Sequence, residues 1–276
     1  MSNDEKQPIW QSSWVNTFGR FLALIIVFGF FAVLVEDGKF YTPRNLENIL
    51  RQSAVYGTAG LGMTMVIITA GIDLSVGSII ALAVVVVAWT LNLPAGEDGF
   101  LIQEWPVVLP ILAVVAGVIA AALAGLANGA MIVGLRLVPF IVTLGMMGIV
   151  RGLAKGIAGE RDIYPEEDTW ISTIMDPTLT SADRQWMVLP PGVWILIIGV
   201  VFASLLLRYT RLGRHIYAVG SNEETARLCG VPVGRTKLIV YALTGLFCGI
   251  SGLMQFSYIG GVGQPTTAVM YELFII

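Results

Sequence analysis

Charged residues are scarce in this sequence. They make up 13% of the 276 residues, against about 25% in soluble proteins, and the mean hydropathy is +0.79. Several uncharged runs reach the length of about 20 residues that crosses a bilayer as a helix. Runs such as SIIALAVVVVAW do not alternate between apolar and polar residues, which argues against a membrane barrel. We therefore predict an all-α polytopic membrane protein.

Histidine and cysteine are nearly absent. His215 is the only histidine, and Cys229 and Cys248 are too few for a disulfide framework or a metal site. A serine hydrolase would need a base, and His215 lies among arginines in a loop. An aspartyl dyad would need two carboxylates at membrane depth, where Asp73 stands alone. An intramembrane enzyme is therefore disfavoured.

Signatures for nucleotides and nucleic acids are also missing. No lysine stands in the P-loop pattern G-x-x-x-x-G-K-[ST], and no basic tract suggests a nucleic-acid partner. We expect the chain itself to bind no cofactor. Its energy would come from a partner that hydrolyses ATP, or from an ion gradient.

About seven apolar segments are long enough to be transmembrane helices. The first ends in bulky residues without a cleavage site, so we expect a retained span rather than a signal peptide. Pro139 cannot donate a backbone hydrogen bond, so the fifth span is expected to be kinked or broken there. The seven predicted spans are 18–35, 53–71, 75–93, 107–128, 131–150, 190–207 and 237–257.

Lysine and arginine in the loops suggest an orientation. The segment from Arg208 to Lys237 is basic and flanks two spans directly, which places it in the cytoplasm together with the N-terminal tail 1–17. The polar loop at about 156–189 is then periplasmic, and the loop at about 208–236 is cytoplasmic. Neither loop has room for a soluble domain. We therefore predict a single transmembrane domain over residues 1–276.

The stretch AGIDLSVGS at 70–78 places one carboxylate, Asp73, between two long apolar runs. A central aspartate costs about 2.5–3.5 kcal/mol on membrane insertion, so its presence needs a reason. In one interpretation the stretch is a tight cytoplasmic turn, and a solvated Asp73, helped by Ser75, caps the third span. In the other, a helix broken near 71–77 lines a polar pathway. The residues alone leave both open.

The inner loop contains a short helix of its own. Ser221 and Glu224 have the spacing of a capping box, and a helix is predicted from Asn222 to Cys229. Gly230 is a natural stop, and Pro232 blocks continuation. A separate helix is more than membrane topology requires, which favours a docking role over a solvated loop.

Three segments carry a resemblance to a known family. They are AGIDLSVGS after GLGMTMVIIT, then LANGAMIVGLRLVPFIVTLGMMGIVRGLA, then RYTRLGRHIYAVGSNEETARLCGVPVGRTKLIVYALTGL. From about Asn45 to Leu273 the chain resembles the inner-membrane permease subunit of bacterial ATP-binding cassette importers for ribose, xylose, arabinose and related monosaccharides. Three motifs in the right order are more specific than any one alone.

The resemblance implies partners and roles. A second permease subunit, two cytoplasmic ATPase subunits and a periplasmic sugar-binding protein are expected, in the cell inner membrane. The short helix would dock into the ATPase, and the GIDLSVGS element would lie by the translocation path. The residues expected to couple to the ATPase are Glu223, Glu224, Ala226, Arg227 and Gly230. The candidates for the path are Asp73, Ser75, Asn128 and Thr143.

The last two candidates also have structural explanations. Asn128 could make an ordinary hydrogen bond between helices, and Thr143 could satisfy a backbone carbonyl freed by a kink at Pro139.

Two further expectations concern the end of the chain and the energy source. Members of this family continue past YEL with a small-residue helix, whereas this sequence reads YELFII, so we expect a truncated chain or a short variant. The alternative function is an ion-coupled secondary transporter of a small polar solute. It is disfavoured because such proteins need relay groups within the spans and often repeat their broken helices, and GIDLSVGS has no second copy.

Overall fold

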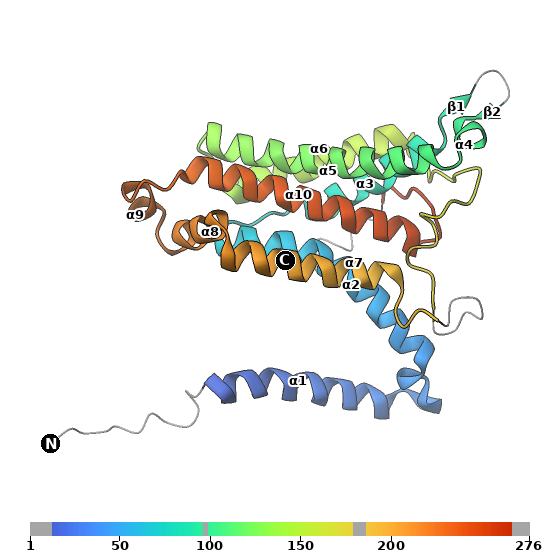
Figure 1. Cartoon of the computed structure of the whole chain (residues 1–276), viewed down its shortest axis with the longest axis horizontal. Helices are drawn as coiled ribbons and strands as arrows, with labels where there is room; N and C mark the ends of the chain where they lie inside the picture. Colours follow the sequence, from blue (N-terminus) through green and yellow to red (C-terminus); the bar gives the residue numbers. More distant parts are fainter. Residues whose placement is uncertain (1–12, 96–98, 179–185, 267–276) are drawn as a thin grey trace. The chain divides into compact units, whose positions relative to one another are not determined.

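The computed structural model describes residues 13–95, 99–178 and 186–266, and these are mostly helical (Figure 1). They divide into two compact units, residues 1–49 and 50–276. The sequence YELFII lies outside the described residues. The elements are α1 (Ser13–Leu34), η2 (Glu36–Tyr41), α2 (Pro43–Ile68), α3 (Val76–Leu91), β1 (Pro94–Ala95), β2 (Gly99–Phe100), α4 (Leu101–Glu104), α5 (Val108–Gly134), α6 (Pro139–Ala158), α7 (Pro191–Tyr209), α8 (Arg211–Ser221), α9 (Glu223–Leu228) and α10 (Val233–Tyr258).

The first unit contains α1, the short η2 and the start of α2. Helix α1 is apolar on every side, and most of its side chains from Phe18 to Leu34 are exposed. The ring of Phe40 packs 4.9 Å from Phe28 and 5.9 Å from Phe31, measured between ring centroids, which fixes η2 against the end of α1. An apolar surface on all sides suits a helix surrounded by lipid.

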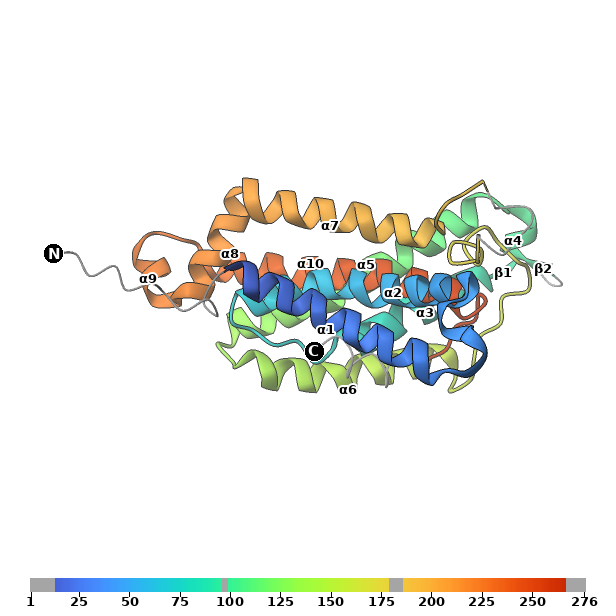
Figure 2. The same cartoon turned by 90° about the horizontal axis from the view of Figure 1, so that it is seen from below.

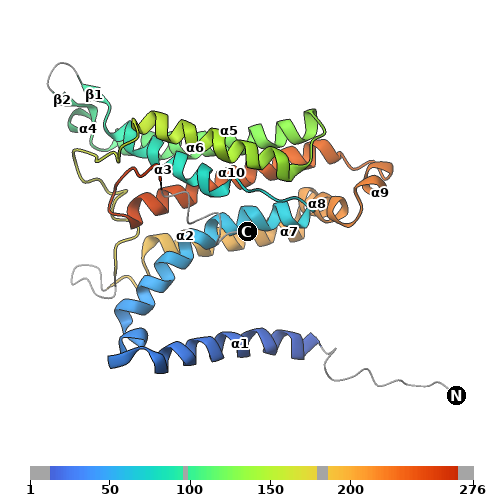
Figure 3. The ribbon, with the colours of Figure 1, turned by 180° about the vertical axis from the view of Figure 1, so that it is seen from behind.

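The second unit is a helix bundle with α3 at its core. Helix α3 is buried along nearly its whole length, as expected for the all-apolar run IIALAVVVVAW. It packs against α5, α6 and α10 (Figure 3). Helix α7 lies on the outside of the bundle, with α8 and α9 at one end of it (Figure 2). The paired strands β1 and β2 and helix α4 lie at the opposite end (Figure 1).

Among the described helices, α5 and α10 make the most extensive contact, and glycines let them approach closely. A Cβ atom at Gly125 would collide with the carbonyl oxygen of Tyr241, and one at Gly245 would collide with the carbonyl oxygen of Ala121. A Cβ atom at Gly249 would lie 2.8 Å from the Cα atom of Val118. Small residues bring helix backbones together in membranes, where burial of apolar surface contributes little to helix association.

Four of the described helices are long and apolar enough to cross a membrane: α5, α6, α7 and α10. Six of the seven predicted spans overlap one long helix each, and 131–150 overlaps both α5 and α6. Helix α3 and the apolar part of α1, Phe21–Leu34, are shorter than this criterion requires, and α2 is not among the four. The chain is thus a helical multi-pass membrane protein. Its count of seven spans and the position of its N-terminus remain predictions.

The predicted boundary between the fourth and fifth spans is wrong. Helix α5 continues to Gly134, and α6 begins at Pro139 instead of being kinked there. Proline is well suited to the first turn of a helix, because the N–H group that it lacks would have no partner there. Pro139 therefore starts α6, and the helical break occupies 135–138.

The inner loop is more structured than the sequence suggested. Helix α8 was not predicted, and Thr210 caps it by accepting a hydrogen bond from the N–H of Gly213 at 3.1 Å. Gly220 packs so tightly on the end of α2 that a Cβ atom there would collide with the carbonyl oxygen of Ile68. The sequence analysis placed this glycine in a loop. In the structure it is part of α8, and its lack of a side chain allows α8 to pack against the end of α2.

Candidate functional site

The helix break predicted near 71–77 is present. Helix α2 ends at Ile68 and α3 begins at Val76, and the residues between them are not helical. The chain leaves α2 through Ala70, whose φ of 57° is left-handed, and the N–H of Gly71 donates to the carbonyl oxygen of Val66 at 3.0 Å. This turn carries Asp73 into the interior of the bundle, where its exposed fraction is 0%.

The carboxyl group of Asp73 is held by three hydrogen bonds. The N–H of Ser75 donates to Oδ1 at 2.9 Å, and the Ser75 hydroxyl donates to the same oxygen at 2.6 Å. Nδ2 of Asn128, on α5, lies 3.4 Å from Asp73 Oδ2 and donates to Ser75 Oγ at 2.7 Å. A buried carboxyl group needs such partners, because burial removes its hydration.

The interpretation of Asp73 as a solvated cap is wrong. Asp73 is fully buried, and Ser75 occupies the N-cap position of α3 without a side-chain capping bond. The backbone group that Asp73 binds is the N–H of Ser75 itself, just before the helix. The carboxyl group therefore belongs to an internal polar network that joins the break to α5.

Thr143 joins the same region from α6. Its hydroxyl oxygen accepts a hydrogen bond from the N–H of Leu74 at 3.2 Å, and it lies 3.4 Å from the carbonyl oxygens of Ile72 and Phe140. The four residues predicted for the translocation path thus meet in one buried region, which we call the Asp73 cluster: Asp73, Ser75, Asn128 and Thr143. That they line a path remains a prediction.

Tyr241 of α10 lies beside this cluster and was missed by the sequence analysis. It is 1% exposed, and a Cβ atom at Gly71 would lie 2.9 Å from its hydroxyl oxygen. Within the described part of the chain, neither the Tyr241 hydroxyl nor Oδ1 of Asn128 has a hydrogen-bond partner. Two unsatisfied polar atoms thus border the helix break. The signal in the sequence was a hydroxyl group within the run KLIVYALTGL.

A pocket of about 430 Å³ lies beside the helix break. It is lined by Thr69, Ala70 and Gly71 of the break and by Pro139, Lys237 and Tyr241. Residues from Val219 to Glu224, at the end of α8 and the start of α9, line it as well. The break and the start of α9 therefore border a single space.

Helix α9 contains most of the residues predicted for coupling. Glu223 accepts hydrogen bonds from Lys237 of α10 at 2.7 Å and from Arg227 at 3.3 Å, so an ion pair fastens α9 to α10. Ala226 is 4% exposed and packs with Val219 and Val233, so its side chain faces its own chain and not a partner.

The outer surface of α9 ends in an exposed apolar residue. Glu224 and Arg227 are exposed, and Leu228 is 89% exposed. Gly230, with a φ of 80°, ends the helix as predicted, and the N–H of Val231 donates to the carbonyl oxygen of Ala226 at 3.0 Å. Leu228 was missed by the sequence analysis, since a leucine in a short helix usually indicates the buried side.

The predicted capping box at Ser221 and Glu224 is wrong. Asn222 is the N-cap of α9, because its Oδ1 accepts a hydrogen bond from the N–H of Thr225 at 2.8 Å, whereas Ser221 is the last residue of α8. Asparagine caps as well as serine does, so the two adjacent residues could not be distinguished from the sequence.

We expect Asn222→Ala to destabilise α9 by about 1 kcal/mol, because the N–H of Thr225 loses its acceptor. Hydrogen exchange of the backbone over 223–230 should become about fivefold faster. Ser221→Ala is the matched control and should leave the exchange rate unchanged. Faster exchange in Ser221→Ala alone would support the capping box instead.

Metal-binding side chains do not gather in the part of the chain that the structure describes. No three His, Cys, Asp or Glu side chains there lie close enough to hold a metal ion. Cys229 is exposed and Cys248 is buried.

Comparison with known proteins identifies the class. Residues 45–276 match the family described as "Branched-chain amino acid transport system / permease component", and the chain belongs to this permease family. It is 33% identical to the ribose import permease protein RbsC of Escherichia coli K12 over 263 residues, which are 95% of this chain and 75% of that protein.

Other relatives agree with this identification. The L-arabinose ABC transporter permease protein AraH of Azospirillum brasilense is 31% identical, over 97% of this chain and 71% of that protein. RbsC of Bacillus subtilis is 32% identical, over 98% and 77%. No solved structure matches the chain. The predicted resemblance is thus confirmed, and the chain is a transport subunit, not an enzyme.

Proposed function

We propose that this chain is the membrane-spanning subunit of an ATP-driven importer and forms the translocation path for a monosaccharide. The names of its ribose and arabinose import relatives support a sugar as the substrate. Its partners would be a second permease subunit, identical or different, two cytoplasmic ATPase subunits and a periplasmic sugar-binding protein. The chain would lie in the cell inner membrane with its N-terminus in the cytoplasm.

The Asp73 cluster is the observation that carries the proposal for the path. A carboxyl, an amide and two hydroxyl groups lie buried at a helix break inside an apolar bundle. Such groups are costly at membrane depth and usually border a route for solutes. Carboxyl and amide groups can exchange hydrogen bonds with the hydroxyl groups of a sugar as it passes.

Helix α9 is the proposed contact with the ATPase. Glu224, Arg227 and Leu228 are exposed on it, and the ion pair of Glu223 with Lys237 ties it to α10. The buried Ala226 packs against Val219 of α8 and Val233 of α10 and so holds α9 on the bundle. No P-loop stands in the sequence, so the partner would bind and hydrolyse ATP, and this chain would bind no cofactor.

Reconstituted uptake tests the proposed function. The chain is placed in vesicles with its partner ATPase and binding protein, and uptake of labelled ribose, xylose and arabinose is measured. We expect uptake of at least one sugar that requires ATP and survives an uncoupler. Uptake that collapses with the uncoupler while ATP is maintained would instead support an ion-coupled secondary transporter.

We expect Leu228→Ser to weaken association with the ATPase about tenfold, because an exposed apolar anchor is lost from the docking helix. Co-purification at fixed protein concentrations measures the effect. The melting temperature should not change, since Leu228 is 89% exposed.

Val188→Ser is the matched control for this change. Val188 is 72% exposed but lies in the loop before α7, at the other end of that helix from α8 and α9. It should leave co-purification unchanged. Equal co-purification of Leu228→Ser and the unmodified chain would contradict the docking role of α9.

A further inference from the structure

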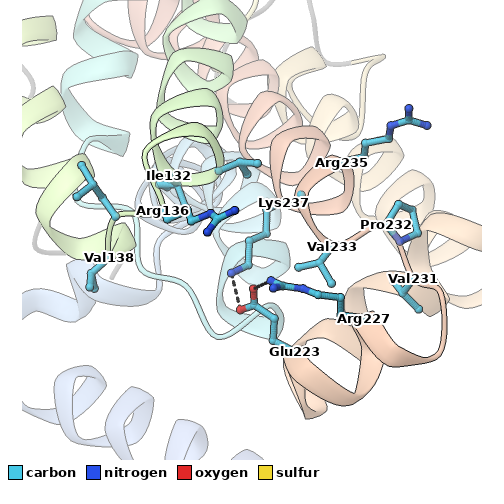
Figure 4. A pocket seen from close by; sticks show the side chains of 13 residues that line it. Ile132, Arg136, Val138, Glu223, Arg227, Val231, Pro232, Val233, Arg235 and Lys237 are labelled. Atoms are coloured by element: carbon cyan, nitrogen blue, oxygen red, sulfur yellow. Dashed lines mark hydrogen bonds and ion pairs between the residues drawn. The ribbon is translucent and has the colours of Figure 1, made fainter.

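A second groove, of about 710 Å³, lies at the end of the bundle that carries α9 (Figure 4). The end of α5, the segment between α5 and α6, helix α9 and the start of α10 form its walls. The side chains of Arg136, Arg227 and Lys237 point toward one another in this groove, whereas Arg235 points away (Figure 4). Three cationic groups from three different segments therefore converge on one space.

The positive charge in this groove is not balanced. Among the described residues that line it, Glu223 is the only carboxylate, and it already pairs with Lys237 and Arg227. Arg136 has no hydrogen bond or ion pair within the described part of the chain. The three converging cations and the one carboxylate leave an excess of two positive charges, which would attract an anion that entered the groove.

The backbone at Arg136 is also unusual. Its φ is 53°, a left-handed conformation that costs energy for any residue other than glycine. A glycine would adopt this left-handed conformation at a lower energetic cost, yet position 136 carries an arginine whose guanidinium faces the groove. A left-handed conformation retained at a non-glycine residue points to a role for the Arg136 side chain.

An exposed apolar surface borders the groove. Leu135, Leu137 and Val138 are 65%, 44% and 60% exposed, and they continue into exposed Phe140 and Ile141 at the start of α6. Helix α6 is long and apolar enough to cross a membrane, and a surface at the end of such a helix is suited to contact with lipid where acyl chains meet headgroups. The groove thus joins a cationic space to a surface suited to lipid.

We propose that this groove binds the phosphate headgroup of an anionic phospholipid, with its acyl chains along Leu137, Val138 and α6. A guanidinium group matches the geometry of phosphate oxygens with two parallel hydrogen bonds, which Arg136 can supply. Lys237 and Arg227 provide further charge. Basic pockets between transmembrane helices are suited to anionic headgroups.

Lipid titration of the purified full chain tests the site. The melting temperature in neutral detergent is measured against dioleoyl phosphatidylglycerol, dioleoyl phosphatidylcholine and inorganic phosphate, and apparent affinities follow from the shifts. We expect protection by phosphatidylglycerol only. Arg136→Gln should weaken its apparent affinity about fivefold. Arg136→Gly, which suits the left-handed backbone, should do the same and keeps the test valid if glutamine disturbs folding.

Arg211→Gln is the matched control. Arg211 is an exposed arginine at the start of α8 that does not line the groove. Its loss should leave the affinity unchanged, and an equal loss would overturn the proposal by showing a diffuse attraction to charge. Equal protection by inorganic phosphate would show a site for a small anion instead. Lipid affinity unchanged in Arg136→Gln, with reduced co-purification of the ATPase, would assign the groove to that partner.

Discussion

Gly125→Leu is expected to lower the melting temperature of the chain by about 10 °C. Even a single Cβ atom at this position would collide with the carbonyl oxygen of Tyr241 on α10. The obstacle is a backbone atom, so the two helices must separate and the contacts along α5 and α10 are lost. Melting in detergent, followed by size-exclusion chromatography, measures the change.

Gly148→Leu is the control for this substitution. Gly148 lies in the interior of α6, where a Cβ atom would meet no atom within 4 Å. Leucine favours a helix over glycine by nearly 1 kcal/mol, so we expect an unchanged or slightly higher melting temperature. A similar loss in both variants would show that leucine is harmful at any glycine, and would contradict the role assigned to the α5–α10 contact.

Asp73→Asn is expected to reduce sugar uptake about tenfold or more, while the chain still folds. The Oδ1 of the new side chain can still accept both hydrogen bonds from Ser75. If the amide of Asn128 rotates, its Oδ1, which has no partner now, can accept from the new amide group, but the hydrogen bond from Asn128 Nδ2 to Ser75 Oγ is then lost. The fold thus keeps both hydrogen bonds from Ser75, and the carboxyl group is replaced by an amide. Reconstituted uptake, together with the melting temperature, separates these effects.

Two comparison variants sharpen this test. Asp73→Leu removes the acceptor of the Ser75 N–H and hydroxyl groups, each of which costs about 1–3 kcal/mol when buried without a partner, so it should fail to fold stably. Ser251→Ala removes another buried hydrogen bond, from the Ser251 hydroxyl to the carbonyl oxygen of Val55 at 2.8 Å, away from the cluster. It should leave uptake intact. Normal uptake in Asp73→Asn would mean that Asp73 serves the fold alone.

Local features were predictable where one residue determines the backbone. The break near Asp73 was predicted from glycine and polar residues between two apolar runs. The stop at Gly230 was predicted because glycine readily adopts the left-handed conformation that ends a helix, and its φ of 80° has that sign. Pro139 was recognised as a point of change, but its consequence was misjudged. A proline can either kink a helix or start one, and the choice depends on where the preceding helix ends.

Helix α8 shows why other parts could not be predicted. Its two glycines disfavour a helix, and Gly220 acquires its role only where α8 meets the carbonyl oxygen of Ile68. The exposure of Leu228 and the burial of Ala226 are similar cases. In a helix as short as α9, the spacing of apolar residues does not indicate which side is buried.

The sequence by itself determined a helical multi-pass membrane protein of the permease family, with a polar break before the third apolar run. The length of the apolar runs and the turn preferences of glycine and proline are enough for this, because both depend only on residues that are close in sequence. Only the tertiary structure decided that Asn128 and Tyr241 lie beside this break and that Lys237 holds α9. Apolar helices can pack against one another in many ways. Contacts between residues far apart in sequence are selected by the close fit of glycines and buried polar groups.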